Sequence, residues 1–294
     1  MNIVKSLWKF LIFTNLLIAL AAAAQTLLSY EIFALPYNFN IILLEFTSTI
    51  LLYNLSIWLS KPNDPLHSPY ERTRWIYGHM AVFWGLSSTA GLVLLYVLSQ
   101  VQFETLLYLG IIGALSLAYA LPIVKIGGKW KSFRHLPYIK VFHIALIWSL
   151  STVGLVYVES INSLLNVTWE SLIYLLGCKF LFILLVTLPF DIRDMKQDSY
   201  YHLKTVPLVL GRAKAKMLCY GLGILHIILV VNMPTSQAVK MGIIACDLLV
   251  LYLFKRRIFK DRNSFVDVYL LDLILVIQYI LCLFSIQISN NFVG

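Results

Sequence analysis

The sequence predicts an all-α, polytopic integral membrane protein with a bundle of about nine transmembrane helices. Of its 294 residues, 60% are hydrophobic and only 13% are charged, whereas soluble domains are usually about 25% charged. The apolar residues occur in runs of roughly 20, which is long enough to cross a hydrocarbon core of about 30 Å. A β-barrel would instead show short segments of alternating hydrophobicity. These observations together favour a helical membrane bundle.

Nine apolar segments are predicted to cross the membrane, and turn-forming residues separate them. Examples are the KPNDPLHSP stretch after the second segment and Gly127-Gly128 after the fourth. No separate soluble region is visible, so the whole chain, 1–294, is expected to form a single domain. We expect helices over 8–28, 39–60, 75–98, 103–121, 137–158, 169–190, 215–232, 236–254 and 266–287.

The basic residues predict the orientation of the bundle. With a cytoplasmic N-terminus, every one of the 23 lysines and arginines except Lys179 and Lys240 lies on the inner side. This asymmetry is typical of cytoplasmic loops and places the loops after the even-numbered segments inside, in an expected bacterial inner membrane. The basic residues then meet anionic lipid headgroups. The net charge of +9 therefore indicates membrane lipid and no nucleic acid as partner.

The first apolar segment has two interpretations. Lys5 and Lys9 precede an apolar run that ends at 21–24, which is also the pattern of a secretory signal peptide. Cleavage there would leave eight segments. The loop at 29–38 is external in both cases, so the later loops keep their sidedness. We expect the first helix to be retained.

Three aspartates follow the sixth segment in the stretch LPFDIRDMKQD, residues 188–198. If the helix continues, Asp191, Asp194 and Asp198 share one face within about 60°. Like charges on one face repel, and Mg²⁺ held by carboxylates and phosphate oxygens would offset this repulsion. The alternative is a solvated helix end that nearby basic residues partly neutralise.

Two stretches resemble motifs of the UbiA superfamily of intramembrane prenyltransferases. DIRDMKQD followed by KTVPLVLG is similar to the family's second aspartate motif, which follows the sixth of nine helices. AYALPIVK, residues 118–125, is similar to the Tyr-x-x-Pro-x-x-Lys element after the fourth helix. The segment number and both positions agree, so the resemblance covers essentially the whole chain. The matching residues are Lys204, Thr205, Pro207 and Gly211 in the first stretch and Tyr119, Pro122 and Lys125 in the second.

The family's first motif, Asn-Asp-x-x-Asp-x-x-x-Asp, is incomplete in this chain. The corresponding stretch is YNLSIWLSKP, residues 53–62. Asn54 keeps the asparagine position, whereas the expected aspartates are Leu55, Trp58 and Pro62. One of the family's two metal sites is therefore expected to be missing. Asp64 and Glu71, in the loop that follows, are alternative ligands whose spacing does not match.

The resemblance implies a Mg²⁺-dependent prenyltransferase that moves an isoprenyl group from a polyprenyl diphosphate to a lipophilic, aromatic acceptor. Asp191, Asp194 and Asp198 would hold the metal and act as the catalytic residues. A cationic side chain, Lys61 or Arg72, would offset phosphate charge where the second metal is missing. The residues expected to bind the diphosphate are Asn54, Lys61, Arg72, Tyr119, Lys125, Arg134 and Lys204.

Two other functions stay open at this point. The incomplete first motif favours a divergent UbiA-like protein that binds isoprenoid lipids without transferase activity. A transporter has less support, because the sequence shows no inverted repeat or paired broken helices. Glu45 and Lys179 lie at overlapping depth in the second and sixth segments, and we expect them to form an ion pair inside the membrane.

Overall fold

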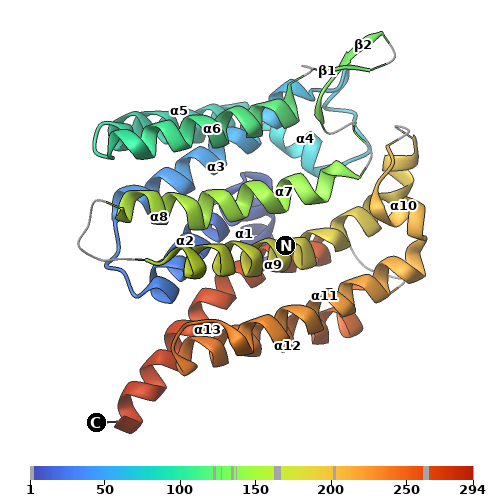
Figure 1. The fold of residues 1–294 in the computed structure, drawn as a ribbon. Coiled ribbons are helices and arrows are strands. Elements are labelled where there is room, and N and C mark those ends of the chain that lie inside the picture. The colour runs from blue at the N-terminus through green and yellow to red at the C-terminus, as the bar shows by residue number, and fades with distance from the viewer. Residues whose placement is uncertain are drawn as a thin grey trace.

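The computed structural model describes residues 3–121, 124–126, 128–133, 136, 138–161, 167–200, 203–260 and 265–293. Within these ranges the chain is a helical bundle with one short hairpin (Figure 1). The elements are, in order, α1 Ile3–Phe13, α2 Leu16–Phe33, α3 Phe39–Leu59, α4 Glu71–Gly78, α5 Met80–Leu98, α6 Phe103–Ala120, β1 Val124–Ile126, β2 Lys129–Lys131, α7 Ile139–Ser149, η2 Leu150–Gly154, α8 Leu155–Ser160, α9 Trp169–Tyr200, α10 Val206–Leu210, α11 Arg212–Asn232, α12 Gln237–Leu253, η3 Phe254–Ile258, η4 Phe265–Tyr269 and α13 Leu270–Val293.

The structure confirms the predicted membrane architecture. Eight helical segments of the described chain are long and apolar enough to cross a membrane, and α6 is a shorter apolar helix between two of them. Together they occupy the nine predicted positions. The protein is therefore an integral, multi-pass membrane protein.

Two predicted helices are interrupted near their starts. The predicted helix 8–28 is wrong, because α1 and α2 meet at Asn15, which has a φ of 62°. Asparagine tolerates this left-handed conformation better than most residues. The predicted helix 75–98 is divided at His79, which is not helical and separates α4 from α5. The interruption at Asn15 brings polar side chains together near the aspartate stretch, as shown below.

Helix α9 extends beyond the predicted limit at 190 and runs to Tyr200. Its 32 residues span about 48 Å, more than the roughly 30 Å of a hydrocarbon core. The aspartates of the LPFDIRDMKQD stretch therefore lie on the last turns of a continuous helix. The condition for their shared face, that the helix continues, is confirmed.

One end of the bundle carries the short elements. Two short strands, β1 and β2, pair antiparallel on either side of the expected turn, as a small addition to the all-α bundle. Gly128 has a φ of +79°, which glycine adopts without strain. Helices α4 and α10 lie at the same end (Figure 1). We call it the motif end.

Helix α9 forms the centre of the apolar core. It packs between α7 and α11, while α13 packs between α2 and α12. Phe182, Leu185 and Leu188 of α9 are buried in the largest apolar cluster. The position of α9 at the centre fixes the aspartates against α7 at the motif end.

The predicted Glu45–Lys179 ion pair is wrong. The Lys179 ammonium is buried and donates to the Gln25 side-chain oxygen at 2.6 Å. Gln25 in turn donates to the side chain of Gln278 at 3.0 Å. Glu45 lies on α3, which packs against α2. Lys179 contacts Gln25 of α2 instead of Glu45. The overlapping depth of the two residues stays a prediction, whereas the predicted contact between their side chains is wrong.

Replacing Gln25 by leucine is expected to destabilise the bundle through Lys179. A buried ammonium that loses its acceptor costs about 3 kcal/mol. The double variant Gln25→Leu/Lys179→Met is expected to be more stable than Gln25→Leu alone, because no charge is left without a partner. Thermal unfolding of the three purified proteins in detergent checks this. Additive losses in the double variant would contradict it.

Helices α12 and α13 approach each other closely at Gly242. A Cβ atom at this position would lie 2.5 Å from the Cα atom of Cys282. Gly242→Ala is therefore expected to push the helices apart and cost about 1–3 kcal/mol. Gly221 of α11 is the matched control, because a Cβ there meets nothing within 4 Å. Thermal unfolding should show a lower midpoint for Gly242→Ala and no loss for Gly221→Ala.

Candidate functional site

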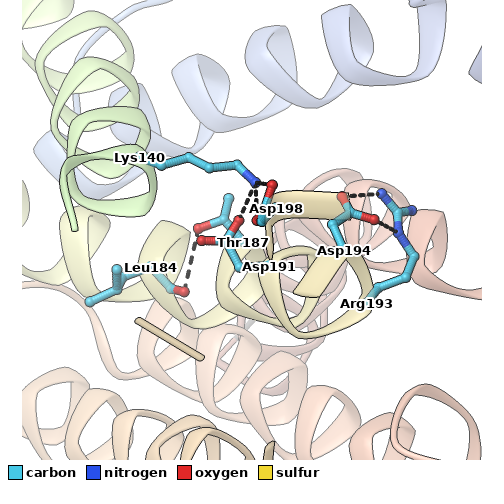
Figure 2. Close-up of polar contacts among 7 residues, drawn as sticks. All are labelled: Lys140, Leu184, Thr187, Asp191, Arg193, Asp194 and Asp198. Atoms are coloured by element: carbon cyan, nitrogen blue, oxygen red, sulfur yellow. Dashed lines mark hydrogen bonds and ion pairs between the residues drawn. The ribbon is translucent and has the colours of Figure 1, made fainter. Parts of the chain in front are cut away.

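Two of the three aspartates converge on one lysine at the motif end. Lys140, on the first turn of α7, reaches across to α9 (Figure 2). Its Nζ lies 2.7 Å from Asp191 Oδ1 and 3.1 Å from Asp198 Oδ2. Asp191 and Asp198 are separated by two helical turns, so they lie on one face of α9. The expected shared face is confirmed for this pair.

The pair is buried and has a free acceptor. Asp191 is 3% exposed and Asp198 is 2% exposed. One ammonium faces two carboxylates, and Asp191 Oδ2 accepts no hydrogen bond from any residue that the structure describes. A buried carboxylate oxygen without a donor is costly. The pair therefore has the charge and the free oxygen to attract a further cation.

Asp194 takes a different direction. Figure 2 shows its carboxylate turned toward Arg193 and away from the Lys140 ammonium. Arg193 donates from Nε and Nη2 to the two oxygens, at 2.7 and 2.9 Å. In the described part of the chain, no three acidic, histidine or cysteine side chains are grouped to hold a metal ion. Metal binding by all three aspartates stays a prediction.

Asp191 and Asp198 fit a Mg²⁺ ion that also binds phosphate oxygens. Mg²⁺ is usually held by one or two carboxylates together with substrate phosphates. The two buried carboxylates supply hard oxygen ligands of this kind, and the free Oδ2 of Asp191 is one of them. Asp194, which is partly exposed, already has a counter-ion.

Backbone hydrogen bonds of the loop after α9 position the start of α7. Leu203 N donates to Asp198 O at 2.9 Å, and Tyr138 N donates to Lys204 O at 2.8 Å. The backbone of the KTVP stretch thus connects the end of α9 to the start of α7. Thr205 is buried beside it, and its hydroxyl has no hydrogen-bond partner among the described residues. These contacts explain the position of Lys140.

The remaining asparagine of the first motif is part of a second polar cluster. Asn54 is buried and accepts from Asn15 at 2.7 Å, while it donates to Ser87 at 2.8 Å. Asn15 also accepts from Arg72 Nη2 at 2.5 Å. The interruption of the helix at Asn15 therefore joins Asn54 to Arg72. Leu55 and Trp58, at the expected aspartate positions, are exposed.

Tyr269 connects this cluster to the aspartate stretch. Arg72 Nη1 donates to the Tyr269 hydroxyl at 3.3 Å, and Arg193 lies over the Tyr269 ring at 5.6 Å. Arg72 has neutral hydrogen-bond partners, and its buried Nε has none among the described residues. The guanidinium groups of Arg72 and Arg193 thus both lie near the Tyr269 ring. Of the two, Arg72 has no carboxylate partner at hydrogen-bond distance in the described chain.

Several predicted binding residues do not join these clusters. The side chains of Lys125 and Lys204 are exposed, and Lys61 is exposed with its ammonium over the Tyr77 ring. Tyr119 stacks on His143 at 5.0 Å. Arg134, like Pro122, lies outside the described residues.

The alternative acidic ligands also point elsewhere. Asp64 contacts His67, and Glu71 pairs with Lys9. The side chains of both acids are more than half exposed. Neither replaces a carboxylate of the first motif in this structure.

Lys140, Asn15 and Tyr269 belong to these polar clusters but were not predicted from the sequence as site residues. Lys140 was counted only among the basic residues that set the orientation, because it is 51 residues from Asp191 and no spacing connects them. Asn15 was placed within an apolar helix. A signal existed for Asn15, since an asparagine inside a predicted membrane helix is unfavourable unless it finds a partner.

Comparison of the whole chain with known proteins gives matches only among solved structures. No protein-family model and no curated protein matches the sequence. A UbiA homologue from Archaeoglobus fulgidus, solved with GPP and Mg²⁺, superposes with a TM-score of 0.64. The match covers 95% of this chain and 99% of the homologue at 15% identity. The protein has the UbiA fold.

Two further structures agree with this fold. A UbiA homologue from Aeropyrum pernix K1 has a TM-score of 0.61 at 13% identity, covering 93% of this chain and 97% of its own. A digeranylgeranylglyceryl phosphate synthase has a TM-score of 0.56 at 15% identity, covering 96% and 98%. The UbiA fold that the sequence motifs implied is therefore confirmed at nearly full length.

Proposed function

We propose that the protein is an integral membrane prenyltransferase, which transfers an isoprenyl group from a polyprenyl diphosphate to a lipophilic, aromatic acceptor. The motif end faces the cytoplasm in this proposal, with the N-terminus on the same side, in a bacterial inner membrane. The basic residues of the loops support this orientation. Asp191, Asp194 and Asp198 form the acidic side of the site.

The buried pair Asp191 and Asp198 is the observation that carries the proposal. A soluble helix end has no need to bury two carboxylates, since burial of charge is costly. In this chain the pair lies at the end of a long helix whose middle is buried among apolar residues. Homologues with the UbiA fold have been solved with GPP or DMAPP and Mg²⁺. Such a site would bind a charged diphosphate at the end of an apolar bundle.

The chain's own residues supply binding and orientation. A Mg²⁺ ion held by Asp191, Asp198 and the diphosphate would act as a Lewis acid that offsets charge on the leaving group. Arg72 donates hydrogen bonds to phosphate oxygens, with its guanidinium oriented by Asn15 and Tyr269. Fixed donors of this kind stabilise charge that develops as the carbon–oxygen bond breaks.

The bundle around the site keeps water from the allylic cation. Phe190 packs against Tyr269 with ring centroids 5.7 Å apart, beneath the Arg193 guanidinium. Aromatic faces attract cations. Exclusion of water lets the electron-rich acceptor, rather than a water molecule, attack the prenyl carbon.

A second candidate is an isoprenoid-binding protein without transferase activity. The specific observation in its favour is that Leu55 and Trp58 replace first-motif aspartates and are exposed rather than directed into the bundle. Under this proposal the site would bind a prenyl diphosphate or another prenyl lipid without releasing diphosphate.

Incubation with labelled prenyl diphosphates of several chain lengths and a membrane lipid extract tests the transferase. The expected result is a labelled, hydrophobic product and stoichiometric release of diphosphate, both abolished by EDTA and restored by Mg²⁺. Binding of the labelled diphosphate without any product or release, across all extracts and chain lengths, would support the second candidate instead.

A further inference from the structure

Lys140 occupies the space in which a cation would bridge Asp191 and Asp198. Its Nζ is within 3.1 Å of an oxygen of each carboxylate, while Mg²⁺ binds its oxygen ligands at about 2.1 Å. An ammonium between the two carboxylates therefore excludes a metal ion that bridges the same two oxygens. In Figure 2 the lysine side chain lies extended from α7 onto this pair.

The charges at this position do not balance. Two buried carboxylates face one ammonium, and Asp191 Oδ2 has no hydrogen-bond donor in the described chain. Arg193 and Asp194 neutralise one another next to the pair. An excess negative charge and a free oxygen thus remain beside Lys140, where a second cation can first bind.

The Lys140 ammonium has a path away from the pair. It is on the first turn of α7, at the motif end, and 14% of its side chain is exposed. Within the described residues, its acceptors are Asp191 and Asp198 alone. A flexible four-carbon stem can move the ammonium to a phosphate without a change in the backbone.

We propose that Lys140 is the resident cation of the Asp191–Asp198 pair: it competes with the divalent ion for these carboxylates and moves to the incoming diphosphate when the ion binds. Lys140 is thus a positioning residue. It keeps the two carboxylates together in the absence of metal and limits stable metal binding to the metal–diphosphate complex. This inference rests on the proposed function.

Mn²⁺ serves as the probe, since carboxylate and phosphate sites that accept Mg²⁺ also accept Mn²⁺. Electron paramagnetic resonance measures its affinity for the purified full-length protein, alone and with inorganic pyrophosphate. Lys140→Met removes the competing charge and should bind Mn²⁺ alone at least about tenfold more tightly, equivalent to 1.4 kcal/mol. Its thermal midpoint should also rise more with Mn²⁺ than that of the unchanged protein.

Lys140→Arg keeps the charge and tests the same competition if Lys140→Met does not fold. Because the planar guanidinium binds carboxylates through two donors, we expect Mn²⁺ affinity at or below that of the unchanged protein. With pyrophosphate present, Lys140→Met should no longer bind Mn²⁺ more tightly than the unchanged protein does, because the variant lacks the lysine that binds the phosphate. A lysine that only connects α7 to α9 would leave Mn²⁺ affinity unchanged in both variants.

Failure of the inference and failure of the proposed function give different results. Unchanged or weaker Mn²⁺ binding by Lys140→Met, in a protein that still forms prenylated product, overturns the role of Lys140 alone. Tighter Mn²⁺ binding by Lys140→Met, together with no prenylated product from the unchanged protein, supports the role of Lys140 and overturns the transferase. Tighter binding by Lys140→Arg would also overturn the competition.

Discussion

Asp191→Asn is expected to reduce prenyl transfer by about 10²- to 10³-fold, the cost of removing one fixed electrostatic contact to developing charge. The substitution keeps the shape of the side chain and removes the charge that faces Lys140. Asp198→Asn should have a similar effect, because both carboxylates are buried and contact the same ammonium. The measurement is release of diphosphate from a labelled prenyl diphosphate at saturating Mg²⁺.

Asp194→Asn is the matched control for these variants. Its carboxylate is partly exposed and is neutralised by Arg193, so we expect a loss of less than about tenfold. Circular dichroism of all three purified variants confirms that the helices are intact. Equal losses at Asp194 and Asp191 would contradict the assignment of the central role to the buried pair.

Arg72→Met is expected to weaken binding of a prenyl diphosphate by about 10- to 100-fold. Hydrogen bonds to charged groups contribute about 1.5–3 kcal/mol, and Arg72 is a half-buried cation whose hydrogen-bond partners are neutral. Arg72→Lys should not restore affinity, since a lysine cannot contact Asn15 and a phosphate with a planar fork. Equilibrium binding of labelled geranyl diphosphate to the purified protein measures the effect.

Lys61→Ala provides the comparison for Arg72. From the sequence, both residues are candidate cations to replace the missing metal, but the Lys61 side chain is exposed and lies over Tyr77. Affinity should change by less than about threefold, as is usual for an exposed charge. Equal losses for Lys61→Ala and Arg72→Met would show that the guanidinium has no special position.

The membrane architecture could be predicted from the sequence because apolar length and basic loops determine it. The nine segments follow from such local patterns, whereas the continuation of the sixth helix through Asp191 and Asp198 was only a condition of the prediction, because the apolar run ends at 190. The helix interruptions at Asn15 and His79 were not predicted, and the one at Asn15 involves a residue whose partners are distant. Asn15 is held by Asn54 and Arg72, which are far away in the chain.

Only part of the site could be predicted, because local sequence patterns do not give contacts between distant residues. The spacing of the aspartates indicated a common face, but it contained no information about Lys140, which only the packing of α7 on α9 brings into contact. The Glu45–Lys179 pair was wrong because hydropathy gives the depth of a residue and not the side of the helix on which it lies. Asp194 does not join Asp191 and Asp198, because its carboxylate forms an ion pair with the neighbouring Arg193.

Binding of geranyl diphosphate to the purified protein, with Mg²⁺ and with EDTA, tests the central claim most directly. Isothermal titration calorimetry on the unchanged protein and on Asp191→Asn/Asp198→Asn gives the four affinities required. We predict binding that requires Mg²⁺ in the unchanged protein and is lost in the double variant. Binding of equal strength in EDTA, retained by the double variant, would contradict a metal-assisted diphosphate site at Asp191 and Asp198.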